Sequence, residues 1–331
     1  MQNKNKNIII FLLIQFFFIN SITQAKSYET FESWLLAYKE TALNKGISQK
    51  TIDATFKDVK FLEQVIKYDR KQPEFYEDTI TYVTKRANIL RVKTAKKLLK
   101  KNIILFDEIE KKFNVEKEIL LALWGIETNF GKHVGKMDII SCLATLSFDK
   151  RRSEFFSNEL FTLLKLIDDK LIDPSTLYGS WAGAYGNFQF MPSSIKQYAI
   201  DYDSNNKIEL KTSLNDAIAS AANYINKMGW NKNQPCFFRV KLNQPIKEKY
   251  INLSARNISY RMTIKEWINK GVTKFDGSNL NTNLSAALIM PDGKKNTPTY
   301  LVFSNYEKIL KWNRSLRFGI SVCTLANLIK I

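Results

Sequence analysis

Cysteine and histidine are scarce in this chain of 331 residues, which has three cysteines and one histidine, His133. An odd number of cysteines gives no disulfide framework, and no two of them have the spacing of metal ligands. We therefore expect Cys142, Cys236 and Cys323 to be small buried residues, with at most one bridge between two of them. His133, in GKHVGK, is expected to be an exposed loop residue to which we assign no role.

Long apolar runs are missing after the first 25 residues, so the remaining sequence offers no membrane-spanning helix. The stretch MQNKNKNIIIFLLIQFFFINSITQA has two lysines, an apolar run over 8–18 and small residues that suit a cleavage site. This pattern is typical of a secretory signal peptide, and no cysteine follows the apolar run to carry a lipid. We predict that the protein is exported.

Acidic residues are few, with 32 Asp and Glu against 50 Lys and Arg, which gives a net charge of +18. Such a surface favours polyanionic partners: nucleic acid, anionic lipid headgroups or acidic cell-wall polymers. Export argues against nucleic acid, as does the lack of a stripe of basic and aromatic residues. The charge therefore predicts electrostatic association with anionic surfaces of the cell envelope.

The apolar pattern predicts a mainly α-helical chain, of the α+β class, with a small β element late in the sequence. Ser48 and Asn114 suit helix N-caps, and Gly131 and Pro192 suit a helix end and a helix start. A loop is expected at Gln72-Pro73. Helices are expected through 27–120 and at about 114–130, 153–170, 192–200, 214–228 and 305–329, and strands at CFFRVKL, LSAALIM and YLVF.

Glu127 ends the expected helix VEKEILLALWGIETNFG, whose residues 119–126 are nearly all apolar. An acid among such neighbours loses hydration, which raises its pKa, and the negative end of a helix adds to this effect. Both effects favour the protonated form that a proton donor needs. The alternative is a buried glutamate neutralised by Arg151 and Arg152. No other carboxylate has a comparable apolar setting, so the sequence offers one convincing acid rather than two.

The stretch GSWAGAYGNFQFMPSS, residues 179–194, holds three of the 12 glycines of the chain. Glycines at this density indicate backbone that lies close to another group, or that turns where a side chain would not fit. The stretch alone does not say which group that is.

Several long motifs resemble one family, the B-type lytic murein transglycosylases of glycoside hydrolase family 103. They are GIETNFG, LATLSFDKRRSEFFSNEL, GSWAGAYGNFQFMPSSIKQYAIDYD and NDAIASAANYINKMGW, with DRKQPEF upstream and WNRS downstream. The resemblance implies a lysozyme-like helical core and cleavage of the β-1,4 bond between N-acetylmuramic acid and N-acetylglucosamine in peptidoglycan. It also implies that the protein acts on glycan strands. We expect a monomer that requires no cofactor, and the signal peptide places it in the periplasm.

In this family one glutamate protonates the leaving oxygen and then assists attack by the 6-hydroxyl of the muramoyl residue, which gives a 1,6-anhydro product. Glu127 matches the catalytic position. The glycine stretch would then line the glycan cleft, where sugars approach the main chain closely. The positions that match substrate-binding residues of the family are Ser180, Gln189, Arg151, Arg152, Tyr224 and Asn313. For each of these a structural role in the surface or the core is the alternative.

The segment DYDSNNKIELKT, 201–212, resembles a degraded EF-hand loop, and members of the family bind calcium here. Asp201, Asp203 and Asn205 supply oxygens at positions one, three and five, while Thr212 replaces the bidentate acid. Asp216 is a candidate replacement for that acid. The alternative is a polar turn between two helices.

The resemblance also suggests how the chain is organised. The expected regions are a signal peptide (1–25), an N-terminal helical region (26–112), a lysozyme-like catalytic core (113–234), a small β-containing region (235–304) and a C-terminal helical segment that returns to the cleft (305–331). Two other functions stay open: a peptidoglycan-binding scaffold without catalysis, and a muramidase that uses water.

Overall fold

The computed structural model describes residues 30–71, 76–293 and 297–330. The expected signal peptide (1–25) and the expected loop at Gln72-Pro73 lie outside these residues. Within the described ranges, none of the helices combines the length and the apolar character needed to cross a bilayer.

The N-terminal part of the chain is helical, as predicted. Its helices are α1 (Phe31–Asn44), α2 (Gln49–Phe56), α3 (Glu63–Arg70), α4 (Thr79–Arg86), α5 (Ile89–Lys101) and α6 (Ile103–Phe113). Ser48 caps α2, where its side chain accepts a hydrogen bond from the backbone N–H of Thr51, so this expected cap is confirmed. Asn88 and Asp78 cap α5 and α4 in the same way.

The middle of the chain adds α7 (Lys117–Thr128), α8 (Ile139–Phe148), α9 (Ser153–Asp168), α10 (Pro192–Tyr198) and α11 (Leu214–Lys227). Pro192 is the first residue of α10, as predicted. Helix α8 was not among the expected helices, and it is buried at every position from Ile139 to Ser147. A short ribbon of β1 (Met137–Asp138) and β2 (Tyr178–Gly179) closes this region.

The prediction that Asn114 caps the N-terminus of α7 is wrong. Asn114 instead ends α6 in a left-handed conformation, with φ of 54°, and Glu116 is the N-cap of α7. The side chain of Glu116 does not cap the helix. It accepts hydrogen bonds from Trp230 Nε1 and from the backbone N–H of Asn233, each with an N···O distance of 2.6 Å. Asparagine enters the left-handed region easily, so the same residue type serves either end of a helix.

The late β element is a mixed sheet in the order β4-β7-β8-β3-β6, with β5 paired to β7. Its elements are β3 (Phe237–Leu242), β4 (Ile251–Asn252), β5 (Met262–Thr263), α12 (Ile264–Asn269), β6 (Val272–Lys274), β7 (Ser285–Ile289) and β8 (Thr299–Val302). The three runs expected to be strands form β3, β7 and β8, which lie at the centre of the sheet. Trp267, Leu288 and Leu301 lie in a small core of their own within this region.

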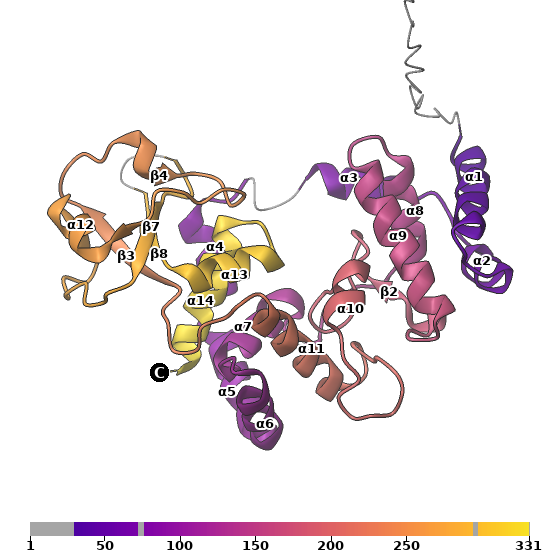
Figure 1. The fold of residues 1–331 in the computed structure, drawn as a ribbon, viewed down its shortest axis with the longest axis horizontal. Helices are drawn as coiled ribbons and strands as arrows, with labels where there is room; N and C mark the ends of the chain where they lie inside the picture. The colour runs from indigo at the N-terminus through magenta and orange to yellow at the C-terminus, as the bar shows by residue number, and fades with distance from the viewer. Residues whose placement is uncertain (1–29, 72–75, 294–296, 331) are drawn as a thin grey trace, which may run out of the picture.

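The chain ends in two helices, α13 (Ser304–Trp312) and α14 (Leu316–Lys330), where the sequence predicted one helical run. The break at 313–315 allows the chain to turn, and α14 then packs against α7 and α4. Figure 1 shows the sheet and α12 at one end of the long axis, α1, α2 and α9 at the other, and α7, α10 and α11 between them.

One disulfide joins the β region to the last helix. It links Cys236, directly before β3, to Cys323 in α14, across 87 residues of sequence. Cys142 is free and buried in α8, and burial raises the pKa of its thiol to about 12. The expectation of buried cysteines with at most one bridge is therefore met, and Cys142 is held as an uncharged thiol.

We expect the double variant Cys236→Ala/Cys323→Ala to lose about 2–5 kcal/mol of unfolding free energy, because the bridge restricts a long loop in the unfolded chain. Urea denaturation of both proteins, with and without dithiothreitol, measures this. Reductant should destabilise the wild type and the control Cys142→Ala but leave the double variant unchanged. Equal stability of double variant and wild type would contradict a formed bridge.

Candidate active site

Glu127 lies in the last turn of α7, a helix that is buried on almost every side. All residues from Ile119 to Gly125 are buried, and a Cβ on Gly125 would lie 2.7 Å from the ring of Phe130. The helix ends at Thr128, and the next three residues all have left-handed φ angles of 51°, 61° and 81°. The sequence assigned this conformation to Gly131 alone, whereas Asn129 already adopts it. The side chain of Glu127 itself is half-buried.

A cleft of about 1070 Å³ opens beside Glu127. Glu127 is the one carboxylate among the described residues that line it, and the same lining includes six basic residues. These are Lys71, Arg151, Arg152, Arg256, Arg314 and Arg317. One acid among many cations suits a single proton donor and a substrate that carries negative charge.

Three other carboxylates, Asp138, Asp149 and Asp173, have structural contacts. Asp138 accepts a hydrogen bond from the backbone N–H of Ser141 at the start of α8. Asp149 binds the guanidinium of Arg70, and Asp173 accepts from the backbone N–H and hydroxyl of Ser175. None of these three lines the cleft as described.

Trp312 contacts the acid directly. Its indole Nε1 donates a hydrogen bond to Oε1 of Glu127, with an N···O distance of 3.0 Å. The two residues are 185 positions apart in the sequence. Trp312 is the last residue of α13 and itself lines the cleft. Sequence reasoning missed it, although it begins the motif WNRS that supplied Asn313.

Tyr224, expected to bind substrate, lies one layer behind the cleft. It is buried in α11, and its ring stacks between those of Tyr198 and Trp312, with centroid distances of 4.2 and 4.7 Å. Its hydroxyl donates to the carbonyl of Lys311 over 3.2 Å. Tyr224 therefore supports the wall of the cleft from α11.

The glycines at 179, 183 and 186 lie against the protein's own chain rather than against open space. A Cβ on Gly179 would lie 2.2 Å from the carbonyl oxygen of Ala184, and one on Gly183 would lie 2.4 Å from Leu143. A Cβ on Gly186 would lie 2.6 Å from the carbonyl oxygen of Leu210. The stretch lines the cleft beside Glu127, as expected, but tight packing against the protein's own chain is what explains its three glycines.

Ser180 and Gln189 of the same stretch do line the cleft. The Ser180 hydroxyl accepts hydrogen bonds from the backbone N–H groups of Ala182 and Ala184, over 3.3 and 3.0 Å. Gln189 has a left-handed φ of 51°, and its amide Nε2 donates to the carbonyls of Val134 and Gly186. Both side chains are thus held in place by hydrogen bonds with backbone groups.

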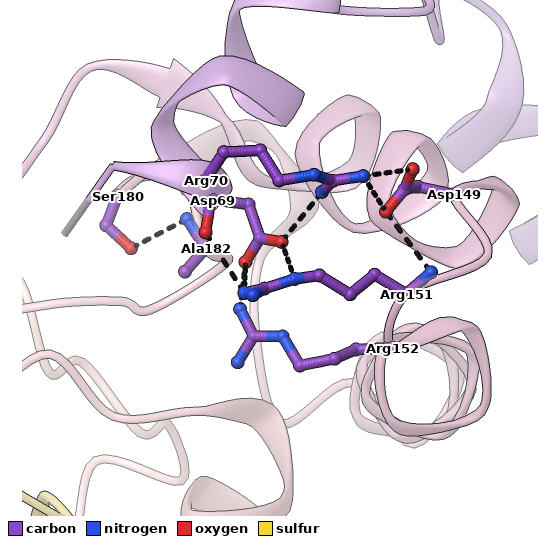
Figure 2. A network of polar contacts seen from close by, with 7 residues as sticks. All are labelled: Asp69, Arg70, Asp149, Arg151, Arg152, Ser180 and Ala182. Carbon is purple, nitrogen blue, oxygen red and sulfur yellow. Dashed lines mark hydrogen bonds and ion pairs between the residues drawn. The ribbon is translucent and has the colours of Figure 1, made fainter.

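Arg151 and Arg152 converge on the buried carboxylate of Asp69, as Figure 2 shows. Arg151 Nε donates to Oδ2 of Asp69 over 2.7 Å, and Arg152 Nη2 donates to Oδ1. Arg70 also reaches Oδ2 and pairs on its other side with Asp149. The sequence left open whether the two arginines neutralise Glu127; their hydrogen bonds go to Asp69.

The charge on Asp69 is set by these neighbours. Asp69 as a residue is 2% exposed, and burial alone would raise the pKa of its carboxyl. The hydrogen bonds and charges of Arg151 and Arg152 outweigh burial and lower the pKa below its ordinary value. Asp69 was missed from the sequence, although it opens the quoted motif DRKQPEF.

Asn313 lies in the break between α13 and α14 and lines the cleft. Its backbone N–H donates a hydrogen bond to the carbonyl of Ile309 at the end of α13, and its own carbonyl accepts a hydrogen bond from the backbone N–H of Ser315. The break therefore turns the Asn313 backbone out of the helix beside Trp312. The cleft thus collects the predicted residues Glu127, Arg151, Arg152, Ser180, Gln189 and Asn313, whereas Tyr224 lies behind it.

The loop at 201–216 brings three carboxylates together. Oxygens of Asp201, Asp203 and Asp216 lie within 4.8 Å of one another. Burial, and then the charges of Asp203 and Asp201, raise the pKa of Asp216, although backbone hydrogen bonds oppose this. A divalent cation would offset that crowded negative charge, so the donor set fits calcium. The Asn205 side chain is turned into the loop, where its oxygen accepts from the N–H of Lys207.

Comparison with known proteins gives one family. The family model described as transglycosylase SLT domain matches residues 30–327. The chain is 48% identical over 121 residues to membrane-bound lytic murein transglycosylase B of Escherichia coli (strain K12). That segment covers 36% of this chain and only 33% of the relative.

Two solved structures are similar over nearly the whole chain. One is SltB3 from Pseudomonas aeruginosa in complex with NAG-NAM-pentapeptide, at 34% identity and a TM-score of 0.84, with 92% of this chain and 80% of that chain covered. The other is Escherichia coli SLT35 in complex with calcium, at 27% identity and a TM-score of 0.76, with 89% and 92% covered. They confirm the mainly helical, lysozyme-like fold.

We expect Asp69→Asn to lower the unfolding free energy at pH 7 by about 1–3 kcal/mol, because it removes the charge that gathers partly exposed arginines. A lowered folded-state pKa gives stability above the ordinary pKa of 3.8 that is lost as the pH falls through the folded value. The difference from wild type in urea denaturation should therefore shrink between pH 5 and pH 3.

Asp169→Asn is the matched control, because Asp169 pairs with Lys165 at an exposed position and should change stability little. If Asp69→Asn lowered the unfolding free energy as little as this control does, the carboxylate of Asp69 would not be what holds the arginines together.

Proposed function

The chain belongs to the transglycosylase SLT domain family, and on that premise we propose that it is a lytic murein transglycosylase acting on peptidoglycan. It cleaves the β-1,4 bond between N-acetylmuramic acid and N-acetylglucosamine without water and releases 1,6-anhydromuramoyl products. The observation that supports this best is a single carboxylate, Glu127, at the end of a buried helix within a large cleft.

Glu127 is proposed as acid and then base. As acid, it gives its proton to the glycosidic oxygen while the bond to the anomeric carbon breaks. As base, it takes the proton of the muramoyl 6-hydroxyl while that oxygen bonds to the anomeric carbon. The sugar supplies its own nucleophile, so no second carboxylate is needed, in contrast to ordinary glycosidases.

The other cleft residues are proposed to hold the glycan. Ser180, Gln189 and Asn313 offer hydrogen-bonding groups, and Arg151 and Arg152 offer positive charge. The peptide stems of peptidoglycan carry carboxylates, which suits a cleft lined by cations. A relative, SltB3, has been solved with NAG-NAM-pentapeptide, which agrees with this choice of substrate.

Export to the periplasm is part of the proposal. The expected signal peptide supports it, and so does the disulfide between Cys236 and Cys323, a bond typical of oxidising compartments. A net charge of +18 would hold the enzyme on anionic surfaces of the envelope.

We expect Glu127→Gln to reduce turnover of purified sacculi by about 10²–10⁴-fold or more while binding to sacculi persists, because the amide cannot transfer the proton. Mass spectrometry of the soluble products should find anhydromuropeptides with the wild type. The matched control is Glu118→Gln, in the first turn of the same helix, which should retain activity.

Products with reducing muramic acid ends would instead identify a hydrolytic muramidase. Binding to sacculi without turnover by the wild type would favour the scaffold.

We also propose that the loop at 201–216 binds calcium. Adding calcium should raise the midpoint of thermal unfolding by several degrees over the chelated protein, and Asp203→Asn should remove that shift. Because the pKa of Asp216 is raised, protons compete with the cation at higher pH than for an ordinary aspartate, so the shift should be smaller at pH 5 than at pH 7. Coincident melting curves with calcium and with chelator would reject the site.

A further inference from the structure

Helix α5 carries a row of lysines on the side that the rest of the protein leaves exposed. Its buried residues are Val92 and Ala95, and the helix packs against α7 and α14. The opposite side holds five exposed lysines: Lys93, Lys96, Lys97, Lys100 and Lys101. Among the residues that the structure describes, none of these five has an ion-pair partner. Cations that the protein itself does not neutralise attract an anionic partner.

Large apolar side chains share this exposed side. Ile89 and Leu90 begin α5, and at 3.6 residues a turn they fall with the five lysines in an arc of about 140°. Ile103 and Ile104 follow at the start of α6. Leu90 is 71% exposed and Ile104 is 73% exposed. Exposed apolar side chains beside lysines suit the surface of an anionic bilayer, where charged headgroups meet acyl chains.

An open hollow of about 450 Å³ continues this surface toward the last helix. Lys96, Lys100 and Ile103 line it together with Lys330 at the end of α14. Glu118 of α7 is the one acid among the described residues of this lining. Three cations against one anion leave the hollow positively charged, which suits a phosphate headgroup.

The acids of α6 are directed toward other elements and do not neutralise α5. Asp107 and Glu110 both pair with Lys117 of α7. The third acid, Glu108, lies near Tyr202, because burial and then the charge of Glu108 raise the pKa of that phenol. The positive charge of α5 is therefore uncompensated from its neighbouring helix.

We propose that α5 and the start of α6 form a surface that binds an anionic lipid bilayer. The five lysines of α5 lie against lipid phosphates, and Leu90 and Ile104 enter the boundary between headgroups and acyl chains. The inference rests on the proposed association with anionic surfaces of the envelope, and it specifies lipid as the partner and α5 as the place. An anionic glycan polymer would offer charge but no apolar phase for Leu90 and Ile104.

This surface and the cleft lie on different sides of α7. Figure 1 shows α5 and α6 at the lower edge of the molecule, below α7, with α3, β4 and α13 above it. The residues that follow α3 and β4, and those at the end of α13, line the cleft. A bilayer bound at α5 therefore leaves the cleft accessible to a glycan strand.

Cosedimentation with lipid vesicles tests the role of charge. The probe is a vesicle of equal parts phosphatidylglycerol and phosphatidylcholine, compared with one of phosphatidylcholine alone. The wild type should bind the mixed vesicle, and added salt should weaken this binding because it screens the lysines. We expect Lys93→Gln/Lys97→Gln/Lys100→Gln to bind the mixed vesicle about 100-fold more weakly, since each lysine at an anionic lipid surface contributes about fivefold.

The matched control removes three exposed lysines from another part of the molecule. Lys50→Gln/Lys57→Gln/Lys60→Gln changes the net charge by the same amount on and after α2, at one end of the long axis (Figure 1). This control should bind the mixed vesicle nearly as well as the wild type. Equal losses in the two triple variants would overturn the inference, because net charge rather than α5 would then hold the protein on lipid.

The apolar side chains are tested separately. Leu90→Gln/Ile104→Gln should weaken binding to the mixed vesicle by about tenfold, because two apolar side chains no longer leave water. Leu36→Gln, at a similarly exposed leucine of α1, should leave the binding unchanged. Unchanged binding of the double variant would show attraction by charge alone and would count against a lipid surface.

A fluorescent label reports direct contact with the bilayer. A thiol-reactive fluorophore at Ile104→Cys should be quenched by lipids brominated on their acyl chains, whereas the same label at Leu36→Cys should not be. Cys142 is buried and the other two cysteines form the disulfide, so the label reacts with the new thiol. A label at Ile104→Cys that stays unquenched on the vesicle would contradict the proposed orientation.

Activity on sacculi distinguishes this inference from the proposed function. Both triple variants should keep wild-type activity without lipid, because no residue of α5 is among the described residues that line the cleft. If the α5 variant lost binding to sacculi rather than to vesicles, α5 would bind the cell-wall polymer and the inference would fail. If the vesicle results were as expected but the wild type did not turn over sacculi, the lipid surface would stand and the proposed function would fail.

Discussion

The burial of α7 on almost every side is the constraint on which the whole site depends. A helix without a polar face has no position at the surface of a small domain, so the other helices must surround it. Its last turn is then the first point where a polar side chain reaches a cleft, and Glu127 occupies that turn. The helix cannot continue past Thr128, because three successive residues turn left-handed. The packing of α7 thus brings the acid to the cleft, where Trp312 donates a hydrogen bond to it.

Asn187 joins this helix to two other parts of the site. Its amide oxygen accepts from Trp124 Nε1 over 2.9 Å, and its carbonyl accepts from the hydroxyl of Thr128 over 2.7 Å. Its amide nitrogen donates to the carbonyls of Leu210 and Lys211, at the end of the loop that gathers the three aspartates. The end of α7, the glycine stretch and the carboxylate loop therefore share one buried amide, which is 7% exposed. A cation that orders the loop would therefore act on the end of α7 through this residue.

Local features of the site could be predicted from the sequence, and long-range contacts could not. The apolar run before Glu127 and the proline at 192 act within one helix, so pattern alone located them. The prediction for Asn114 was wrong because an asparagine suits both ends of a helix, and only the packing of α6 on its neighbours decides which end it occupies. The density of glycines in 179–194 correctly indicated close approach of the backbone to another group, but it could not identify that group as the protein's own chain. Trp312 and Asp69 act on residues 185 and about 82 positions away, a relation that no local pattern records.

Because 185 residues separate Trp312 from Glu127, the hydrogen bond between them depends on how α13 and α14 pack. Between α11 and α13 the chain forms the sheet. The chain must then come back beside α7 for the indole N–H of Trp312 to reach the carboxylate of Glu127. The packing of α14 on α7 and the disulfide from Cys323 to Cys236 both act on that return. The bridge joins Cys236, directly before the sheet, to Cys323 in α14, which limits the conformational freedom of the long segment between them. The β region, which lines the same cleft at 253–256 and at Pro291, thus also bears on whether the hydrogen-bond donor of Glu127 is in place.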